Sequence, residues 1–239
     1  MFHRQVVETR FLTFGRLVAL IPPCMIASNV LALGLADLSN QEAGTGLRAA
    51  LERGAGAAVS RLGVENGFLN NDKVRIQLPG ILEKARPLLK MTGRGQQLDE
   101  LVVSMNHAAE AAVPMAKPLL ISAVKSMSLT DAKNILTGGE TSVTDFFRQK
   151  TTDQLKVRFL PVVKNVTDRS GLSSQYNAVM GQASKLGAVS PEQATVETYV
   201  TQRALEGLYT MIGEEEKAIR KDPIGSGSAI IGKVFGALR

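Results

Sequence analysis

Apolar residues recur every three or four positions along most of the chain beyond residue 37, which is the period of helices that bury one face. Glycines and prolines divide this pattern into pieces of helical length. The pattern therefore predicts an all-α fold. The segments that we expect to be helical are 39–62, 79–90, 98–112, 119–127, 130–137, 142–147, 151–166, 172–186 and 190–221. In the first of them a stripe runs along one face, and its small residues predict that another helix approaches closely; its residues are Leu47, Leu51, Gly54, Ala58 and Leu62.

Capping residues sharpen several of these boundaries. Thr130 is the expected N-cap of the short helix that ends before the two glycines at 138 and 139. Thr151 with Gln154 forms a capping box, which predicts that a separate helix begins there. The run SPEQ at 190–193 combines an N-cap, a proline at the first helical position and a glutamine at the third. It is the strongest start signal in the chain.

Residues 73–79 alternate strictly between polar and apolar side chains, which predicts one short extended segment without a partner strand. Pro114, Pro118 and Pro161 lack the amide N–H of a helix interior, so we expect breaks or kinks there. The sequence thus predicts a single bundle-like domain of kinked helices over residues 37–224, with at most this one extended segment.

The two ends of the chain differ from this body. Residues 1–16 carry three arginines and one glutamate, and residues 17–36 carry no charge, which is the order of an export signal. We expect residues 1–36 to be a signal peptide that directs the protein to the periplasm or cell envelope. A retained anchor and a cytoplasmic helix are the alternatives.

The other end, residues 225–239, begins with a Gly/Ser break and continues as a short apolar stripe. We expect this tail to be helical and to dock on the body of its own chain. Contact with a membrane or with a partner is the less favoured alternative.

Composition excludes several classes of protein. Of the 239 residues, 44% are hydrophobic and 21% are charged, a mixture too apolar for disorder and too polar for a polytopic membrane protein. One cysteine and two histidines argue against a disulfide framework and against a metal site, so we expect no metal and no cofactor. Basic residues are dispersed, and the chain beyond residue 36 has a net charge of only +4, so we expect no nucleic-acid partner.

Several phrases of the sequence together resemble one bacterial family. They are MNHAAE at 105–110, MSLTDAKNIL at 127–136, DFFR at 145–148, YVTQRALEGL at 199–208 and EEEKAIRKDP at 214–223. They resemble the domain-of-unknown-function family 4197, over nearly all of residues 38–236. The resemblance implies an exported helical protein, and it implies no activity.

A candidate polar site centres on Asn106 and Glu110. These residues lie four apart at the edge of the apolar stripe of their helix and are flanked by alanines, so they can form a buried polar pair against a neighbouring element. Arg148 or Arg220 would neutralise such a pair. A satisfied structural network is the first interpretation, and a ligand site is the second.

Other acids have local explanations. Asp131 lies in the first turn of a predicted helix, where the helix dipole stabilises a carboxylate, so capping explains it. Glu216 and Arg220 lie four apart and predict a solvent-facing ion pair. The alternative is that Glu215 or Arg220 reaches inward and joins a ligand site.

Three aromatic side chains, Phe146, Phe147 and Tyr199, are candidates for the core that can also line an apolar pocket. Together with the helices rich in glycine and alanine, they favour a non-enzymatic binding or interaction module. It would present an apolar interhelical surface or pocket to a lipid-like ligand or a protein partner.

The alternative function is a carboxylate-based enzyme of the cell envelope. It would use Glu110 with Asn106 and a second acid, such as Asp131 or Glu215, for general acid–base chemistry. The sequence does not show whether these groups converge.

Overall fold

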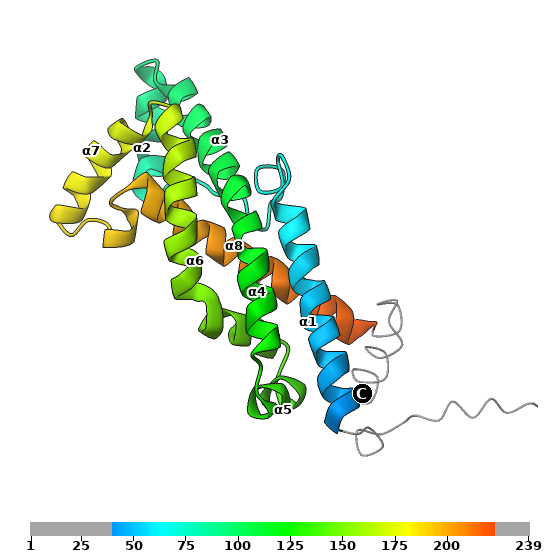
Figure 1. Ribbon diagram of the computed structural model, residues 1–239. Coiled ribbons are helices and arrows are strands. Elements are labelled where there is room, and N and C mark those ends of the chain that lie inside the picture. Colours follow the sequence, from blue (N-terminus) through cyan, green and yellow to red (C-terminus); the bar gives the residue numbers. More distant parts are fainter. Residues whose placement is uncertain (1–39, 223–239) are drawn as a thin grey trace, which may run out of the picture. The chain divides into compact units, whose positions relative to one another are not determined.

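The computed structural model describes residues 40–222, which form a body of α-helices without a strand (Figure 1). The all-α prediction is confirmed. The predicted signal segment 1–36 and the tail 225–239 lie outside the described residues. The helices are α1 (Asn40–Leu62), α2 (Gly80–Met91), α3 (Gly95–Ala112), α4 (Ala116–Lys125), α5 (Leu129–Thr137), α6 (Ser142–Arg169), α7 (Ser173–Lys185) and α8 (Val196–Lys221), with 3-10 turns at Val113–Met115 and Pro191–Gln193.

The helices α6 and α8 form the centre of this body. In Figure 1, α8 passes behind α6 and α3, and it packs against α1 as well. Burial of each large apolar side chain stabilises the fold by about 1.5–3 kcal/mol. The apolar residues that α8 buries recur at helical spacing, and they are Val196, Tyr199, Val200, Ala204, Leu205, Leu208, Tyr209, Met211 and Ile212.

The first helix, α1, buries the stripe expected from the sequence. Leu47, Leu51, Ala58 and Leu62 are at most 2% exposed, and the helix ends before Gly63. Small residues on this face bring α1 close to α8, since a Cβ at Gly54 would lie 3.5 Å from the Cβ of Glu215. The prediction that glycine and alanine serve a close helix–helix approach agrees with this geometry.

The helix α6 is one helix of 28 residues, where the sequence predicts two. Thr151, the expected N-cap of the second helix, lies inside α6, and its hydroxyl donates to the carbonyl oxygen of Phe147 at 2.7 Å. Because this bond satisfies the hydroxyl within the helix, the backbone continues. The buried stripe Phe147, Leu155, Phe159 and Val163 runs straight through the predicted boundary. The capping box at Thr151 is therefore a wrong prediction.

The run SPEQ at 190–193 opens only a 3-10 turn, Pro191–Gln193, and not α8 itself. The N-cap of α8 is Thr195, whose hydroxyl accepts from the amide of Thr198 at 3.2 Å. The predicted start is thus four residues or more too early. Two caps compete here over a few residues, and the packing of α8 decides between them.

Of the three prolines at which breaks or kinks are predicted, one lies between two helices and the other two lie within helices. Pro114 lies in the 3-10 turn that separates α3 from α4, so the predicted break is confirmed. Pro118 lies in the first turn of α4, where its missing N–H has no intrahelical acceptor to lose. Pro161 lies inside α6, which continues to Arg169.

Gly207 of α8 allows the connection between α1 and α2 to approach the helix. A Cβ at this position would lie 2.6 Å from the ring carbon Cε1 of Phe68 and 3.2 Å from the Cβ of Val74. Both of those side chains are buried. Position 207 therefore has no room for a side chain, because Phe68 and Val74 pack directly against the backbone of α8.

We predict that Gly207→Ala destabilises the fold by about 1–3 kcal/mol, because the added methyl group overpacks the contact with Phe68. The matched control is Gly56→Ala in α1, where a Cβ would meet nothing within 4 Å. This control should stabilise the protein by about 0.5–1 kcal/mol, since alanine is the better helix former. Urea unfolding followed by circular dichroism measures both changes. Equal changes in the free energy of unfolding for the two variants would contradict close packing at Gly207.

Candidate functional site

Asn106 of α3 is fully buried and binds the connection between α1 and α2. Its Oδ1 accepts from the amide of Ile76 at 2.8 Å, and its Nδ2 donates to the carbonyl oxygen of the same residue at 2.9 Å. Nδ2 also donates to the carbonyl oxygen of Val102 at 2.8 Å. The side chain thus pairs with both backbone groups of Ile76, as a neighbouring strand would. Of the predicted extended segment 73–79, residues 73 and 74 lie in a turn and residues 75–79 belong to no helix or strand.

Glu110 lies one turn further along α3 and is 5% exposed. Its Oε1 accepts from the amides of Phe68 at 3.0 Å and Leu69 at 3.1 Å, and its Oε2 accepts from the amide of Asn66 at 3.1 Å. Asn66 has a φ of 62°, in the left-handed region that asparagine tolerates better than most residues. Three backbone dipoles therefore surround the buried carboxylate and stabilise its charge.

The predicted polar pair exists, but its partners differ from those expected. Asn106 and Glu110 both bind backbone groups of residues 66–76 rather than side chains of a neighbouring helix. Neither arginine proposed to neutralise the pair contacts it among the described residues. Arg148 lies over the ring of Tyr209, and Arg220 pairs with Glu216. Backbone amides need no charged partner to satisfy a carboxylate, so the predicted role of the arginines is wrong.

Glu216 of α8 is a second buried carboxylate, and the sequence had suggested an exposed one. Its side chain is 1% exposed and that of Arg220 is 19% exposed. Oε1 accepts from the amide of Val143 at 3.1 Å, and Oε2 accepts from the amide and the hydroxyl of Thr144, both at 3.2 Å. The first amides of α6 have no acceptor within the helix, and they draw the carboxylate inward. The predicted solvent-facing ion pair is therefore wrong.

Arg220 completes this cluster from the next turn of α8. Its Nη2 lies 3.0 Å from Oε1 of Glu216, and the same nitrogen donates to the hydroxyl of Ser142 at 2.8 Å and to the carbonyl oxygen of Ile135 at 3.2 Å. The inward-reaching alternative for Arg220 thus describes its geometry. The contacts join α5, α6 and α8 at one point.

Asp131 caps α5, with Ser128 as the N-cap in place of the predicted Thr130. Its carboxylate accepts from the amide of Ser128 at 3.1 Å, and its own amide donates to the Ser128 hydroxyl at 3.0 Å. The ammonium of Lys150 lies 3.4 Å from the carboxylate. The hydrogen bonds from Ser128, with a smaller effect of Lys150, lower the pKa of Asp131 below its ordinary value.

The acids named for the enzymatic alternative contact different elements. Glu110 binds the connection after α1, Asp131 caps α5, and Glu215 lies 2.7 Å from the guanidinium of Arg61 in α1. The cleft beside Asp131 is lined by neither Glu110 nor Glu215. The alternative stays a hypothesis that this geometry does not support.

The three aromatic candidates lie in the core. Phe147 is fully buried and meets Phe146 edge to face, with ring centroids 5.4 Å apart. Phe146 also lines a cleft of about 370 Å³ beside Asp131. Tyr199 is 5% exposed, and its hydroxyl donates to the carbonyl oxygen of Gln77 at 2.8 Å. The core interpretation therefore describes all three better than a lining role in the main cleft described next.

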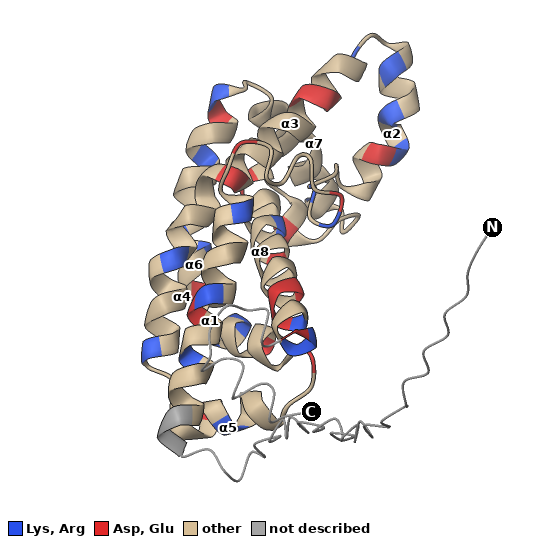
Figure 2. Ribbon diagram, turned by 90° about the vertical axis from the view of Figure 1, so that its right-hand side faces the viewer, with Lys and Arg blue, Asp and Glu red and all other residues tan. Residues whose placement is uncertain are grey.

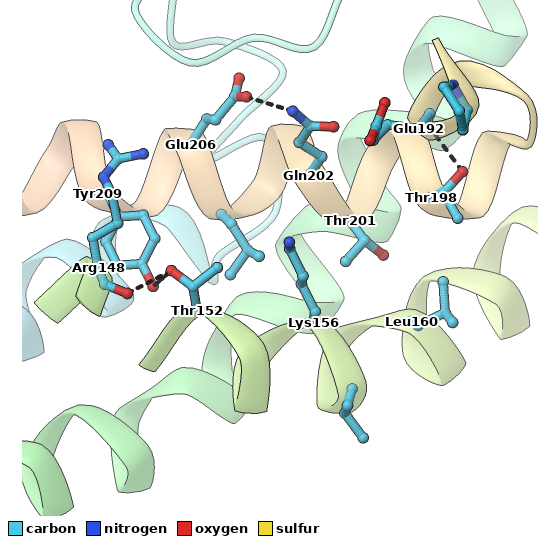
Figure 3. A pocket seen from close by; sticks show the side chains of 13 residues that line it. Arg148, Thr152, Lys156, Leu160, Glu192, Thr198, Thr201, Gln202, Glu206 and Tyr209 are labelled. Carbon is cyan, nitrogen blue, oxygen red and sulfur yellow. Dashed lines mark hydrogen bonds between the residues drawn. The ribbon is translucent and has the colours of Figure 1, made fainter. Parts of the chain in front are cut away.

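A cleft of about 620 Å³ lies between α6 and α8 (Figure 3). One wall is a row of α6 residues at four-residue spacing, and the other is a row of α8 residues that faces it. The turn at Pro191 closes one end. The lining residues are Arg148, Thr152, Lys156, Val157 and Leu160 of α6, Thr198, Thr201, Gln202, Leu205, Glu206 and Tyr209 of α8, and Pro191 and Glu192 of the turn.

Of these residues, the sequence-based candidates included only Arg148. The row from 148 to 160 is visible in the sequence as polar and apolar residues four apart, beside the buried stripe of α6. A row of this kind occurs on every amphipathic helix, however. Only the packing of α6 on α8 shows that two such rows face each other.

The cations of the cleft, Arg148 and Lys156, form no ion pair within 4 Å among the described residues. Hydrogen bonds with its own backbone and with Ser190 lower the pKa of Glu192, and the charge of Lys156 across the cleft contributes to a smaller extent. The guanidinium of Arg148 lies 5.0 Å from the ring centroid of Tyr209, a favourable cation–π geometry. The hydroxyl of Tyr209 lies within hydrogen-bonding distance of the hydroxyls of Thr151 and Thr152, at 2.9 and 3.0 Å. Among the described residues, no carboxylate lies within 4 Å of Arg148 or Lys156.

On the opposite wall, Glu206 is already engaged. Its carboxylate accepts from Arg203 at 2.7 Å and from Gln202 at 3.1 Å. Thr201, in the same wall, has a buried hydroxyl without a hydrogen-bond partner, and Figure 3 shows its side chain pointing from α8 toward α6. A buried hydroxyl left unpaired costs about 1–3 kcal/mol.

Residues 40–222 also provide information on membrane spans and metal sites. No helix in this range combines the length and the apolar character of a membrane span. In the same range, no three His, Cys, Asp or Glu side chains are grouped as a metal site requires.

The model of the family described as "Protein of unknown function (DUF4197)" matches residues 37–236. The chain belongs to this family. The match confirms the resemblance carried by the sequence phrases and includes every helix described above. The family's description assigns no activity. No curated protein and no solved structure matches the chain.

We predict that Glu110→Gln lowers the free energy of unfolding by about 1–3 kcal/mol, because an amide NH₂ then faces a backbone N–H in place of an acceptor. Urea unfolding of the variant and of the original protein checks this. The control is Glu52→Gln on the exposed face of α1, which should change stability by less than about 0.5 kcal/mol. If Glu110→Gln is as stable as the control, Glu110 does not hold the connection.

Proposed function

We propose that this protein is a non-enzymatic binding protein, and that the cleft between α6 and α8 holds an amphipathic small molecule with an anionic head group. The observation that carries the proposal is the pair Arg148 and Lys156. Both line a cleft that also exposes the apolar Val157, Leu160 and Leu205, and neither has a carboxylate within 4 Å among the described residues. An anionic group bound there would supply the missing counter-charge.

The apolar side chains of the cleft support a lipid-like ligand. Val157 is 75% exposed and Leu160 is 39% exposed, and Leu205 lines the facing wall. An apolar chain laid between α6 and α8 would cover these surfaces and remove them from water. The volume of about 620 Å³ lies in the range of small-molecule sites.

The charges along the cleft suggest how the ligand lies. In Figure 3, Arg148 and Glu192 are at opposite ends, with Lys156 between them. Glu206, which also lines the cleft, is engaged by Arg203 and Gln202. An anionic head group is therefore favoured at the Arg148 end, and the apolar chain would extend toward Leu160.

We predict saturable binding of cis-parinaric acid, a fluorescent fatty acid, with displacement by oleate but not by oleyl alcohol. Arg148→Gln should raise the dissociation constant about tenfold or more, because a hydrogen bond to a charged group is lost. The dissociation constant of Arg148→Lys, which keeps the charge, should lie between those of the original protein and of Arg148→Gln. A fluorescence titration measures all of these values.

The control for this titration is Lys125→Gln in α4, an exposed lysine outside the cleft, which should leave the affinity unchanged. Circular dichroism of Arg148→Gln verifies its fold. Absence of saturable binding, or an unchanged affinity of folded Arg148→Gln, contradicts the proposed function.

We also propose that the protein is exported to the periplasm or cell envelope. The support is the order of charges and apolar residues in 1–36, together with membership of a family whose resemblance implied export. This location fits a protein that handles lipid-like molecules.

We predict that protein purified from the periplasmic fraction begins at Leu33 or Asp37, after the small residues Ala32 or Ala36. N-terminal sequencing measures this. The double variant Val18→Arg/Leu20→Arg should abolish export, because two charges interrupt the apolar segment. A chain that retains Met1 and stays in the cytoplasm would contradict the proposal.

A further inference from the structure

The helix α2 has two apolar faces, and residues 40–222 cover only one of them. Its contacts are chiefly with α3, against which the buried Leu82 and the partly buried Leu89 pack. The other face carries Ile81, Leu88 and Met91, which are 41, 65 and 85% exposed. These three residues follow the spacing of one helical face. Leu88 and Met91, two of the exposed large apolar side chains among residues 40–222, therefore lie near the end of α2 that leads into α3.

One cation lies within this exposed face and others lie elsewhere on or after α2. At 100° per residue Lys84 falls between Leu88 and Met91, whereas Lys90 lies on the polar side of the helix. Residues 84–98 contain four Lys or Arg residues and no acid. Arg86 is held by Glu83 and Asp99, at 2.6 and 2.5 Å. Lys84, Lys90 and Arg94 are exposed, and none of them has a carboxylate within 4 Å among the described residues. Figure 2 shows the basic positions of α2 in blue along the helix.

We propose that the outer face of α2 binds the surface of an anionic phospholipid bilayer. In this arrangement α2 lies in the plane of the head groups, Leu88 and Met91 enter the boundary of the acyl chains, and Lys84 binds a lipid phosphate. Lys90, on the polar side of the helix, and Arg94, after its end, add positive charge near the same surface. An amphipathic helix with apolar residues on one face and flanking cations binds membranes in this way. Each cation near an anionic surface strengthens binding about fivefold, from roughly 1 kcal/mol per charge.

The charge pattern favours a bilayer over a second copy of the chain as the occupant. A two-fold symmetric contact brings the same patch of two molecules together. Lys84, which lies within the apolar face, would then meet Lys84 of the other copy without an acidic partner. An anionic lipid surface meets this charge, and those of Lys90 and Arg94 near it, with opposite sign. This surface is separate from the α6–α8 cleft, and the inference does not rest on the ligand proposed there.

Sedimentation of the full chain with vesicles tests this inference. The vesicles contain either phosphatidylcholine alone or phosphatidylcholine with 30% phosphatidylglycerol. The original protein should bind the anionic vesicles and bind the neutral ones far more weakly. Lys84→Gln/Lys90→Gln should weaken binding to anionic vesicles roughly 30-fold, from about fivefold for each charge. Leu88→Ser/Met91→Ser should also abolish most of the binding.

Matched controls separate this face from the rest of the chain. Lys125→Gln/Lys133→Gln removes two exposed charges from α4 and α5, and Leu129→Ser removes a side chain that is 79% exposed in α5. Both controls should bind within about twofold of the original protein. Equal loss in variants and controls, or unchanged binding by both folded α2 variants, overturns the inference. So does a dimer in lipid-free ultracentrifugation that Leu88→Ser/Met91→Ser converts to a monomer.

Discussion

Buried backbone amides that have no acceptor in a helix must find one elsewhere, and this constraint organises the whole body. Glu110 accepts from three amides of the connection after α1, and Asn106 pairs with both backbone groups of Ile76. Glu216 accepts from the first amides of α6. Each bond joins segments that lie far apart in the sequence. The polar side chains of this core are thus structural ties, each matched to a particular stretch of backbone.

These ties also set the geometry of the cleft. Glu216 and Arg220 hold the start of α6 against α8, and the Tyr209 hydroxyl bonds to Thr151 and Thr152 about two turns further along α6. These contacts join the two walls of the cleft directly. A preorganised site avoids the entropic cost of ordering its walls on binding. The hydrogen bonds that hold α6 and α8 together thus also set the cleft between them.

Charged groups divide into two populations in this protein. Glu110, Glu216 and Asp131 are bound by amides, hydroxyls or cations, so their charges are compensated within the fold. No carboxylate among residues 40–222 lies within 4 Å of Arg148 and Lys156 in the cleft, or of Lys84, Lys90 and Arg94 in and after α2. Arg86 of α2 is the exception, because it pairs with Glu83 and Asp99. Uncompensated charge beside exposed apolar surface favours contact with an amphipathic anion. The two proposed contacts, a ligand in the cleft and a lipid surface at α2, share this chemistry at separate places.

Local patterns in the sequence were enough to predict the all-α class, the stripe of α1, the break at Pro114 and the adjacency of Asn106 and Glu110, because each depends on spacing within one helix. They were insufficient for the single long α6, the true caps of α5 and α8, the burial of Glu216 and the lining of the cleft. Neighbouring residues compete to cap the same helix. A row of residues on one helix lines a cleft only where a second row faces it. Glu216 is buried because it meets Val143 and Thr144, 73 and 72 positions away, and the walls of the cleft meet through Tyr209 and Thr151, 58 positions apart. Packing brings these residues together, so only the tertiary structure decided those outcomes.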